Sequence, residues 1–83
     1  MRCLFLNIRG FGVPGRRTLL KDNIRKHKID VICLQETIRQ SFSDQELHSL
    51  EVGDLFFWCW IPATGHSGGI LLGVRDSLFE LGD

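Results

Sequence analysis

Two polar residues, Asn7 and Glu36, follow apolar runs at positions where their side chains could do chemistry. Asn7 comes after the run "CLFL" at residues 3–6, and Glu36 comes after "VICLQ" at residues 31–35. A glutamate carboxylate is a ligand for a hard cation such as Mg²⁺, and an asparagine amide can hydrogen-bond a phosphate oxygen without adding charge. One carboxylate beside one amide is therefore compatible with a metal-assisted phosphoryl site, in which the cation supplies the positive charge.

Both residues also have a simpler interpretation, and spacing alone favours it. Asn7 could hydrogen-bond the backbone of the turn that follows it, and Glu36 could end its strand in solvent without any ligand. The interpretation as a site requires the two strands to lie side by side in one sheet, because open α/β sheets place ligands at the carboxyl ends of their strands.

The elements that would position these residues are two strands separated by a helix. Residues 2–8 and 29–35 are apolar at consecutive positions, which is typical of strands covered on both faces. Between them, Leu20 and Ile24 are four residues apart and cations fill the segment that follows, so the pattern predicts a helix over residues 16–27. Whether the two strands are neighbours is not decided by this pattern.

The second half of the chain changes from this alternation to a hairpin. Ser43 and Glu46 have the spacing of a capping box, which predicts a short helix over residues 44–50. The apolar runs at residues 55–61 and 70–74 are joined by the turn-rich segment "PATGHSGG", which favours an antiparallel hairpin. The predicted order is β-α-β-α-β-β, an α/β arrangement with mixed strand directions.

The predicted sheet lacks cover for one of its faces. Three of its strands are apolar on both sides, and two helices are too few to cover both faces of four strands. The 83-residue length also allows at most one small domain, because so short a chain buries only about 60% of its unfolded surface. We therefore expect residues 1–83 to form the N-terminal part of a larger layered domain, which is incomplete by itself.

The composition is that of a globular protein, with 43% hydrophobic residues and a mean hydropathy of +0.02. The apolar runs are too short for a membrane span or a signal peptide, so we expect an intracellular protein without a membrane partner. The three cysteines, Cys3, Cys33 and Cys59, lie inside apolar runs and form no C-x-x-C pair. This pattern favours reduced core cysteines over a zinc site.

The charges are divided unevenly along the chain. Residues 1–28 contain eight of the ten lysines and arginines but only one of the ten acidic residues. The cations of the first predicted helix could contact phosphates, but the same pattern is typical of a solvated helix face, which we favour. Arg9 lies beside the predicted site and is the better candidate for a DNA contact. The aromatic residues Phe56, Phe57, Trp58 and Trp60 could stack on nucleic-acid bases. In a strand, however, Phe57 would point to one side and the other three to the opposite side, which is the pattern of a strand buried on both sides, so all four are expected in the core.

The glycine-rich segment "GFGVPG" at residues 10–15 invites a different interpretation. It fits G-x-G-x-x-G between a strand and a helix, and Glu36 follows about 20 residues later, as in a dinucleotide-binding module. Three features weigh against this module. Pro14 removes an amide donor from the loop, Arg16 and Arg17 are bulky at the helix entry, and a hairpin replaces further βαβ windings.

The segments "LNIRGFG" and "IDVICLQET" resemble the opening of the endonuclease/exonuclease/phosphatase family, which has the fold of deoxyribonuclease I and the apurinic/apyrimidinic endonucleases. Together with "GRRTLLKDNI" and "FFWCWIPATGHSGGILLGV", they are most similar to the endonuclease domain of plant LINE-type non-LTR retrotransposons. The resemblance implies a DNase I-like α/β sandwich that hydrolyses DNA in the nucleus. It also implies that Asn7 orients the phosphate and that Glu36 binds Mg²⁺ or Mn²⁺.

Other residues that the resembling family needs are missing from this sequence. The chain has no tyrosine and no Asp-x-Asn pair, and His66 does not match the catalytic histidine of the family. His27 and His48 fall on predicted helices and are expected to be solvated. We therefore expect weak metal binding and no activity from this chain alone. A non-catalytic nucleic-acid-binding remnant is the alternative.

Overall fold

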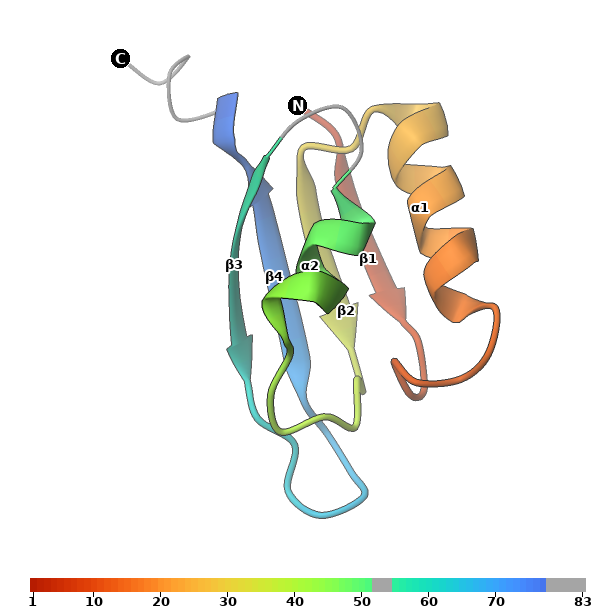
Figure 1. Cartoon of the computed structure of the whole chain (residues 1–83), viewed down its shortest axis with the longest axis vertical. Helices are drawn as coiled ribbons and strands as arrows, with labels where there is room; N and C mark the ends of the chain where they lie inside the picture. The colour runs from red at the N-terminus through yellow and green to blue at the C-terminus, as the bar shows by residue number, and fades with distance from the viewer. Residues whose placement is uncertain (52–54, 78–83) are drawn as a thin grey trace.

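A single mixed sheet forms the centre of the computed structural model, which describes residues 1–51 and 55–77. Its strand order is β1-β2-β4-β3 (Figure 1), and the strands are β1 (Cys3–Asn7), β2 (Val31–Gln35), β3 (Phe56–Ile61) and β4 (Ile70–Arg75). β1 and β2 are parallel neighbours, whereas β4 is antiparallel to both β2 and β3. The predicted α/β class, element order and hairpin are confirmed.

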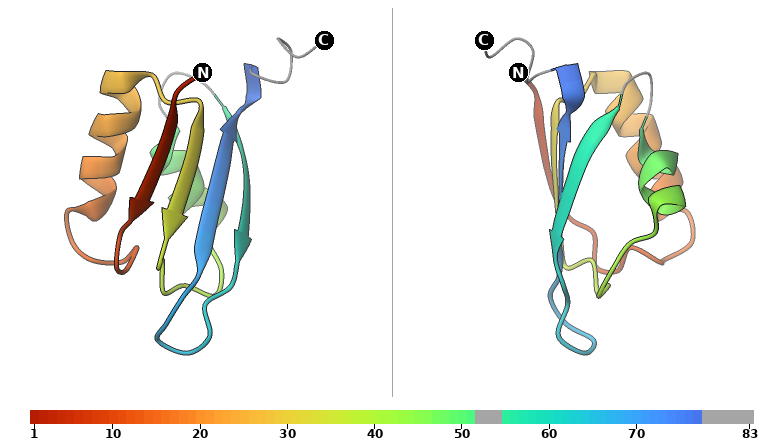
Figure 2. Two further views of the ribbon diagram at one scale, coloured as in Figure 1. Left: turned by 180° about the vertical axis from the view of Figure 1, so that it is seen from behind. Right: turned by 60° about the vertical axis from the view of Figure 1, so that its left-hand side comes forward.

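Both helices lie on the same side of this sheet (Figure 2). α1 (Arg16–His27) and α2 (Asp44–Leu50) have the predicted bounds. The predicted capping box of α2 is formed, because the Ser43 hydroxyl accepts the Glu46 amide at 3.1 Å and the Glu46 carboxylate accepts the Ser43 amide at 3.0 Å. No helix in the described part of the chain is long and apolar enough to cross a membrane.

The hydrophobic core fills the layer between the helices and the sheet. Leu20 and Ile24 of α1 are buried against it, as their spacing predicts. Phe42 makes edge contacts with Phe11 and Trp60, at ring-centroid distances of 4.9 and 5.4 Å. The other buried apolar residues of this layer come from β2, α2, β3, β4 and the connecting loops and include Ile8, Ile32, Leu34, Leu47, Leu50, Phe56 and Leu71.

The opposite face of the sheet is open within the described residues. Alternation along β2 turns Ile32 and Leu34 toward the helices, so Cys33 and its cross-strand neighbours point the other way. On that face Phe5 is 67% exposed and Phe57 is 58% exposed. The expectation that two helices leave one face uncovered is confirmed.

The open face also corrects two expectations about core residues. Cys3 and Cys59 are exposed and Cys33 is half-buried, because all three lie on the uncovered side of the sheet. They are free cysteines but not core cysteines. In β3, Phe56 is buried and Trp58 and Trp60 pack against the core as predicted. The expectation that Phe57 is also in the core is wrong, because Phe57 is 58% exposed on the open face. The prediction of core burial thus holds only for the helix-facing side of each strand.

Candidate metal and phosphate site

The ends of β1 and β2 lie at the same edge of the sheet. In their parallel register Asn7 is opposite Gln35, and Glu36 is the next residue along the chain. The loop between β3 and β4 reaches the same end of the molecule (Figure 1). The arrangement that the site interpretation required is therefore present, because the two parallel strands are neighbours and end together.

The side chains of Asn7 and Glu36 are both exposed. Within residues 1–51 and 55–77, neither side chain makes a hydrogen bond or an ion pair. The Glu36 carboxylate and the Asn7 amide are thus both available to a ligand, and the turn backbone does not occupy Asn7. Their chemical roles stay predictions.

The loop after β1 extends the pairing of β1 with β2 beyond the strands. Three amides of this loop donate in succession to the carbonyls of the last residue of β2 and the two residues after it: Ile8 to Gln35 at 3.0 Å, Gly10 to Glu36 at 2.8 Å, and Phe11 to Thr37 at 2.8 Å. The Thr37 and Ile38 amides then donate to Gly69 and Gly68, at 3.1 and 2.9 Å. The segments "IRGF", "ETI" and "GG", widely separated in the sequence, therefore form one hydrogen-bonded junction around Glu36.

The backbone at this junction is in an uncommon conformation. Glu36 and Ile38 both have positive φ, of 53° and 56°, and Arg9 in the neighbouring loop has a φ of 50°. A left-handed conformation costs a non-glycine residue roughly 1–2 kcal/mol, so it persists only where surrounding bonds impose it. The hydrogen bonds of Gly10 and Gly69 to this segment supply that constraint, and they place Glu36 at the sheet edge against its own preference.

Arg9 lies in the loop directly after β1 and is exposed. Nearby Arg16 has a structural partner, because its guanidinium donates to the Ile8 carbonyl. Within the described residues Arg9 makes no side-chain hydrogen bond or ion pair, so its charge remains available near Asn7. Arg9 thus keeps the position that made it a candidate for a phosphate contact, and that contact stays a prediction.

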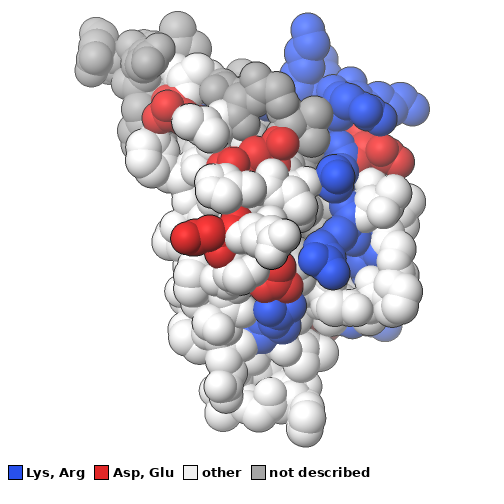
Figure 3. Space-filling view, viewed as in Figure 1, with Lys and Arg blue, Asp and Glu red and all other residues white. Residues whose placement is uncertain are grey.

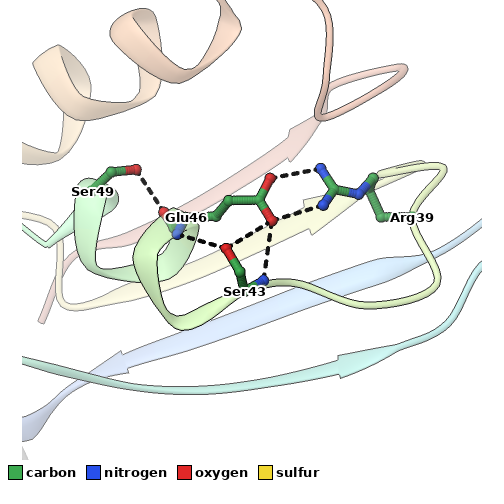
Figure 4. A network of polar contacts seen from close by, with 4 residues as sticks. All are labelled: Arg39, Ser43, Glu46 and Ser49. Carbon is green, nitrogen blue, oxygen red and sulfur yellow. Dashed lines mark hydrogen bonds and ion pairs between the residues drawn. The ribbon is translucent and has the colours of Figure 1, made fainter.

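An ion pair that the sequence analysis did not predict joins the loop after Glu36 to α2 (Figure 4). The Arg39 guanidinium donates to both oxygens of the Glu46 carboxylate, at 2.8 and 2.7 Å, and it packs over the rings of Phe11 and Phe42. The hydrogen bond from Arg39 and that from the Ser43 amide lower the pKa of Glu46 to about 2. The capping-box spacing identifies Glu46 in the sequence, but nothing in the spacing identifies Arg39 as its partner.

The cations of α1 lie on the helix side of the molecule (Figure 3). Arg17, Lys21 and Arg25 are exposed, and Arg25 pairs with Asp22 on the same helix at 3.4 Å. Exposure is expected both of a solvated helix face and of a phosphate-contacting surface, so the preference for a solvated face stays a prediction. The three histidines are also exposed, and the His48 ring bonds Glu51 at 2.6 Å, away from the sheet edge.

The donor set at the sheet edge suits a loosely held divalent cation. No group of three or more His, Cys, Asp or Glu side chains that could hold a metal occurs among the described residues. Glu36 alone supplies a carboxylate, with an amide oxygen available from Asn7. Mg²⁺ commonly keeps several waters and binds through one or two carboxylates, so these residues fit one side of such a site but not a complete cage.

Comparison with known proteins identifies a family for the chain as a whole. The model of the endonuclease/exonuclease/phosphatase family matches residues 4–82. The fold is similar to a crystal structure of the AP endonuclease LMAP from Leishmania major, with a TM-score of 0.70 and 20% sequence identity. That similarity covers 90% of this chain but only 24% of the LMAP chain. Comparison with curated proteins gave no significant match. The family match disfavours the interpretation of residues 10–15 as a dinucleotide-binding module.

Proposed function

Because the chain belongs to the endonuclease/exonuclease/phosphatase family, we propose that it is part of a divalent-metal-dependent DNA endonuclease of the retrotransposon type. The observation that carries the proposal is the shared sheet edge of Asn7 and Glu36. The segments "LNIRGFG" and "LQETIRQSFSDQELHSL" support the finer assignment to LINE-type elements. A nuclear location is part of that assignment. It rests on the resemblance alone, because no targeting signal is visible in residues 1–83.

In this proposal each residue at the sheet edge has one role. Glu36 would hold Mg²⁺ or Mn²⁺ through its free carboxylate, and such an ion would supply positive charge next to the phosphoryl group. Asn7 donates a hydrogen bond to a phosphate oxygen and so orients the phosphodiester. Arg9 contacts the DNA backbone from the adjoining loop, where its charge attracts phosphate irrespective of base sequence.

We further propose that residues 1–83 supply only one side of the catalytic site and are inactive alone. The chain spans about a quarter of the length of LMAP, and its sequence contains no tyrosine and no Asp-x-Asn pair. The open sheet face supports the same proposal, because Phe5 and Phe57 would be shielded from water by a second layer. One carboxylate without a second acidic cluster binds Mg²⁺ weakly.

The test is a Mn²⁺ titration of the full chain, followed by paramagnetic broadening of its NMR signals. We expect broadening centred on Glu36 and Asn7 in the wild type, and its loss in Glu36→Gln. Asp44→Asn removes an exposed carboxylate from α2 and serves as the matched control, which should bind Mn²⁺ as the wild type does. Broadening that survives Glu36→Gln would refute the metal site.

Supercoiled plasmid in Mg²⁺ tests the expected inactivity. We expect no nicking by the 83-residue chain above the level of a protein-free control. Nicking that Glu36→Ala abolishes would contradict the proposal that the chain is inactive alone, and it would at the same time support the assignment of Glu36.

A non-catalytic nucleic-acid-binding role is the second candidate, favoured by the exposed cations of α1 (Figure 3). Binding to DNA through phosphates weakens steeply with salt. Gel shifts at two salt concentrations would compare Arg9→Gln at the sheet edge with Lys21→Gln on α1. A loss confined to Lys21→Gln would favour the helix face as the binding surface, whereas a loss confined to Arg9→Gln would favour the sheet edge.

A further inference from the structure

The hydroxyl of Thr37, the residue after Glu36, is buried without a partner. Thr37 is 1% exposed, and its Oγ1 has no hydrogen-bond partner within the described residues. A buried hydroxyl that makes no bond carries an uncompensated desolvation penalty. The Thr37 side chain therefore contributes no hydrogen bond to the fold. What it contributes is packing.

Thr37 packs against the face of Gly69 that lacks a side chain. A Cβ built on Gly69 would lie 2.5 Å from Thr37 Oγ1, 3.2 Å from the Cβ of Ala63 and 3.3 Å from the Ile38 amide nitrogen. No real Cβ tolerates the first of these distances. Gly69 also has a φ of +91°, which residues with side chains rarely adopt. Two features thus favour glycine at position 69: a Cβ would collide with Thr37, and the backbone has a positive φ.

The same two residues are joined through their backbones. The Thr37 amide donates to the Gly69 carbonyl at 3.1 Å, and Thr37 lies between the two left-handed residues Glu36 and Ile38. Thr37 is therefore fixed both by its side-chain packing and by its backbone hydrogen bond to Gly69. Its two neighbours, Glu36 and Ile38, are the residues with positive φ. Movement of Thr37 away from Gly69 would release the constraint on the φ angle of Glu36.

We propose that Thr37 and Gly69 are a positioning pair that holds the Glu36 carboxylate at the sheet edge for its cation. Neither residue touches the cation in this proposal, and both act through the backbone of Glu36. The inference rests on the proposed function only in taking Glu36 as the metal ligand. The claim that Thr37 and Gly69 fix the backbone of Glu36 does not depend on the proposed function, because it rests only on the contacts described above.

The adjacent glycine offers a matched control for the test. Gly68 has a φ of +79°, but a Cβ built there would have no neighbour within 4 Å. Gly68→Ala and Gly69→Ala therefore share the penalty of a left-handed alanine, and only Gly69→Ala also meets Thr37. In the Mn²⁺ titration we expect Gly69→Ala to bind about tenfold more weakly than Gly68→Ala, as for other residues that orient a metal ligand. Adding Thr37→Ala to Gly69→Ala removes the clashing oxygen and should restore part of the affinity.

Amide hydrogen exchange supplies a readout that does not depend on the metal. We expect the Thr37 amide to exchange faster in Gly69→Ala than in Gly68→Ala, while the Ile29 amide beyond α1 keeps its rate in both. Equal effects of the two alanines on both readouts would overturn the pairing and leave only backbone strain. If the wild type binds no Mn²⁺ at Glu36, the proposed function fails, and the exchange rates still decide whether the pair fixes the junction.

Thr37→Ala in the wild-type background covers the case in which Gly69→Ala does not fold. This substitution removes the packing against Gly69 without adding an atom. We expect faster exchange of the Thr37-position and Ile38 amides and weaker Mn²⁺ binding, with the overall fold retained by circular dichroism. Unchanged exchange and unchanged Mn²⁺ affinity in Thr37→Ala would overturn the proposal.

Discussion

Asn7 lies directly opposite Gln35 in the parallel register of β1 and β2, so a single residue step along the chain leads from its partner to Glu36. This relationship brings the amide and the carboxylate to one sheet edge, although 28 residues separate them in the sequence. Parallel pairing of neighbouring strands has this effect because both strands then end at the same side of the sheet. The candidate site depends on this pairing more than on any single side chain.

The charge at position 7 should tune metal affinity at this edge. Asn7→Asp places a second carboxylate beside Glu36, and a divalent cation is bound more tightly as the number of charged ligands rises. We expect Asn7→Asp to bind Mn²⁺ about tenfold more tightly than the wild type and Asn7→Ala to bind it more weakly. Gln45→Glu adds the same charge on exposed α2 and controls for net charge. Equal affinities of Asn7→Asp and Asn7→Ala would contradict a role for position 7.

The contact between Gly73 and Trp58 should limit substitution in the middle of the sheet. A Cβ on Gly73 would lie 2.4 Å from the Trp58 ring, so Gly73→Ala must displace a ring packed on the core. We expect a loss of about 2 kcal/mol in the free energy of unfolding, typical of an overpacked core. A Cβ built on Gly12 would have no neighbour within 4 Å, so Gly12→Ala should change the free energy of unfolding by less than about 0.5 kcal/mol. Urea unfolding followed by circular dichroism measures both, and similar values for the two variants would refute the packing account.

The ion pair of Arg39 and Glu46 should make stability fall at low pH. The pKa of Glu46 is lowered from 4.5 to about 2 in the folded chain, so its contribution is fully present above about pH 4.5. It is lost as the pH falls through about 2, because the folded state must then protonate a bonded carboxylate. Glu46→Gln should lower the unfolding free energy at pH 7 by on the order of 2 kcal/mol. Asp44→Asn on the same helix is the control, and an acid transition unchanged by Glu46→Gln would contradict the prediction.

The bond between His48 and Glu51 should add a second pH dependence, with opposite signs for the two groups. The hydrogen bond to Glu51 raises the pKa of His48, so its contribution is present below pH 6.5 and is lost as the pH rises through the folded value. For Glu51, burial raises the pKa, but hydrogen bonds from His48, Phe56 and Trp58 outweigh burial and lower it. That contribution is present above pH 4.5 and is lost as the pH falls through the folded value.

The pair therefore stabilises most between about pH 4.5 and 6.5. We expect His48→Gln to remove the decline in unfolding free energy above pH 6.5, measured by urea unfolding at several pH values. His66→Gln changes an exposed histidine of the β3–β4 loop and should leave the profile as it is. A profile that His48→Gln does not alter would show that the bond contributes nothing measurable.

Thiol labelling should report on the open face of the sheet. Cys3 and Cys59 are exposed and Cys33 is half-buried, and all three point to the face that carries no helix. In the 83-residue chain we expect Cys3 and Cys59 to react with a maleimide faster than Cys33, as resolved by peptide mass spectrometry. Protection of all three before unfolding would contradict an open face and would indicate that another layer covers it.

Local sequence signals were sufficient for the secondary structure of this protein. The spacing of Leu20 and Ile24 predicted α1, and the capping-box residues Ser43 and Glu46 predicted the start of α2. Such signals act within a few residues, because they reflect one helical turn, one cap or one strand alternation. The same locality explains what was wrong. A run such as "FFWCWI" is apolar on both sides, but the run does not reveal that Phe57 and Cys59 point to the face that the described residues leave open.

The tertiary structure decided the neighbours of these elements. Only the pairing of β1 with β2 brings Asn7 beside the strand that leads to Glu36, and only the junction with Gly69 fixes the Glu36 backbone. Arg39 and Glu46 likewise meet through a loop geometry that their spacing does not encode. The sequence by itself therefore determined the elements and the residue types at their ends. The three-dimensional contacts decided which ends meet, because hydrogen bonds between distant segments depend on the whole sheet rather than on any one segment.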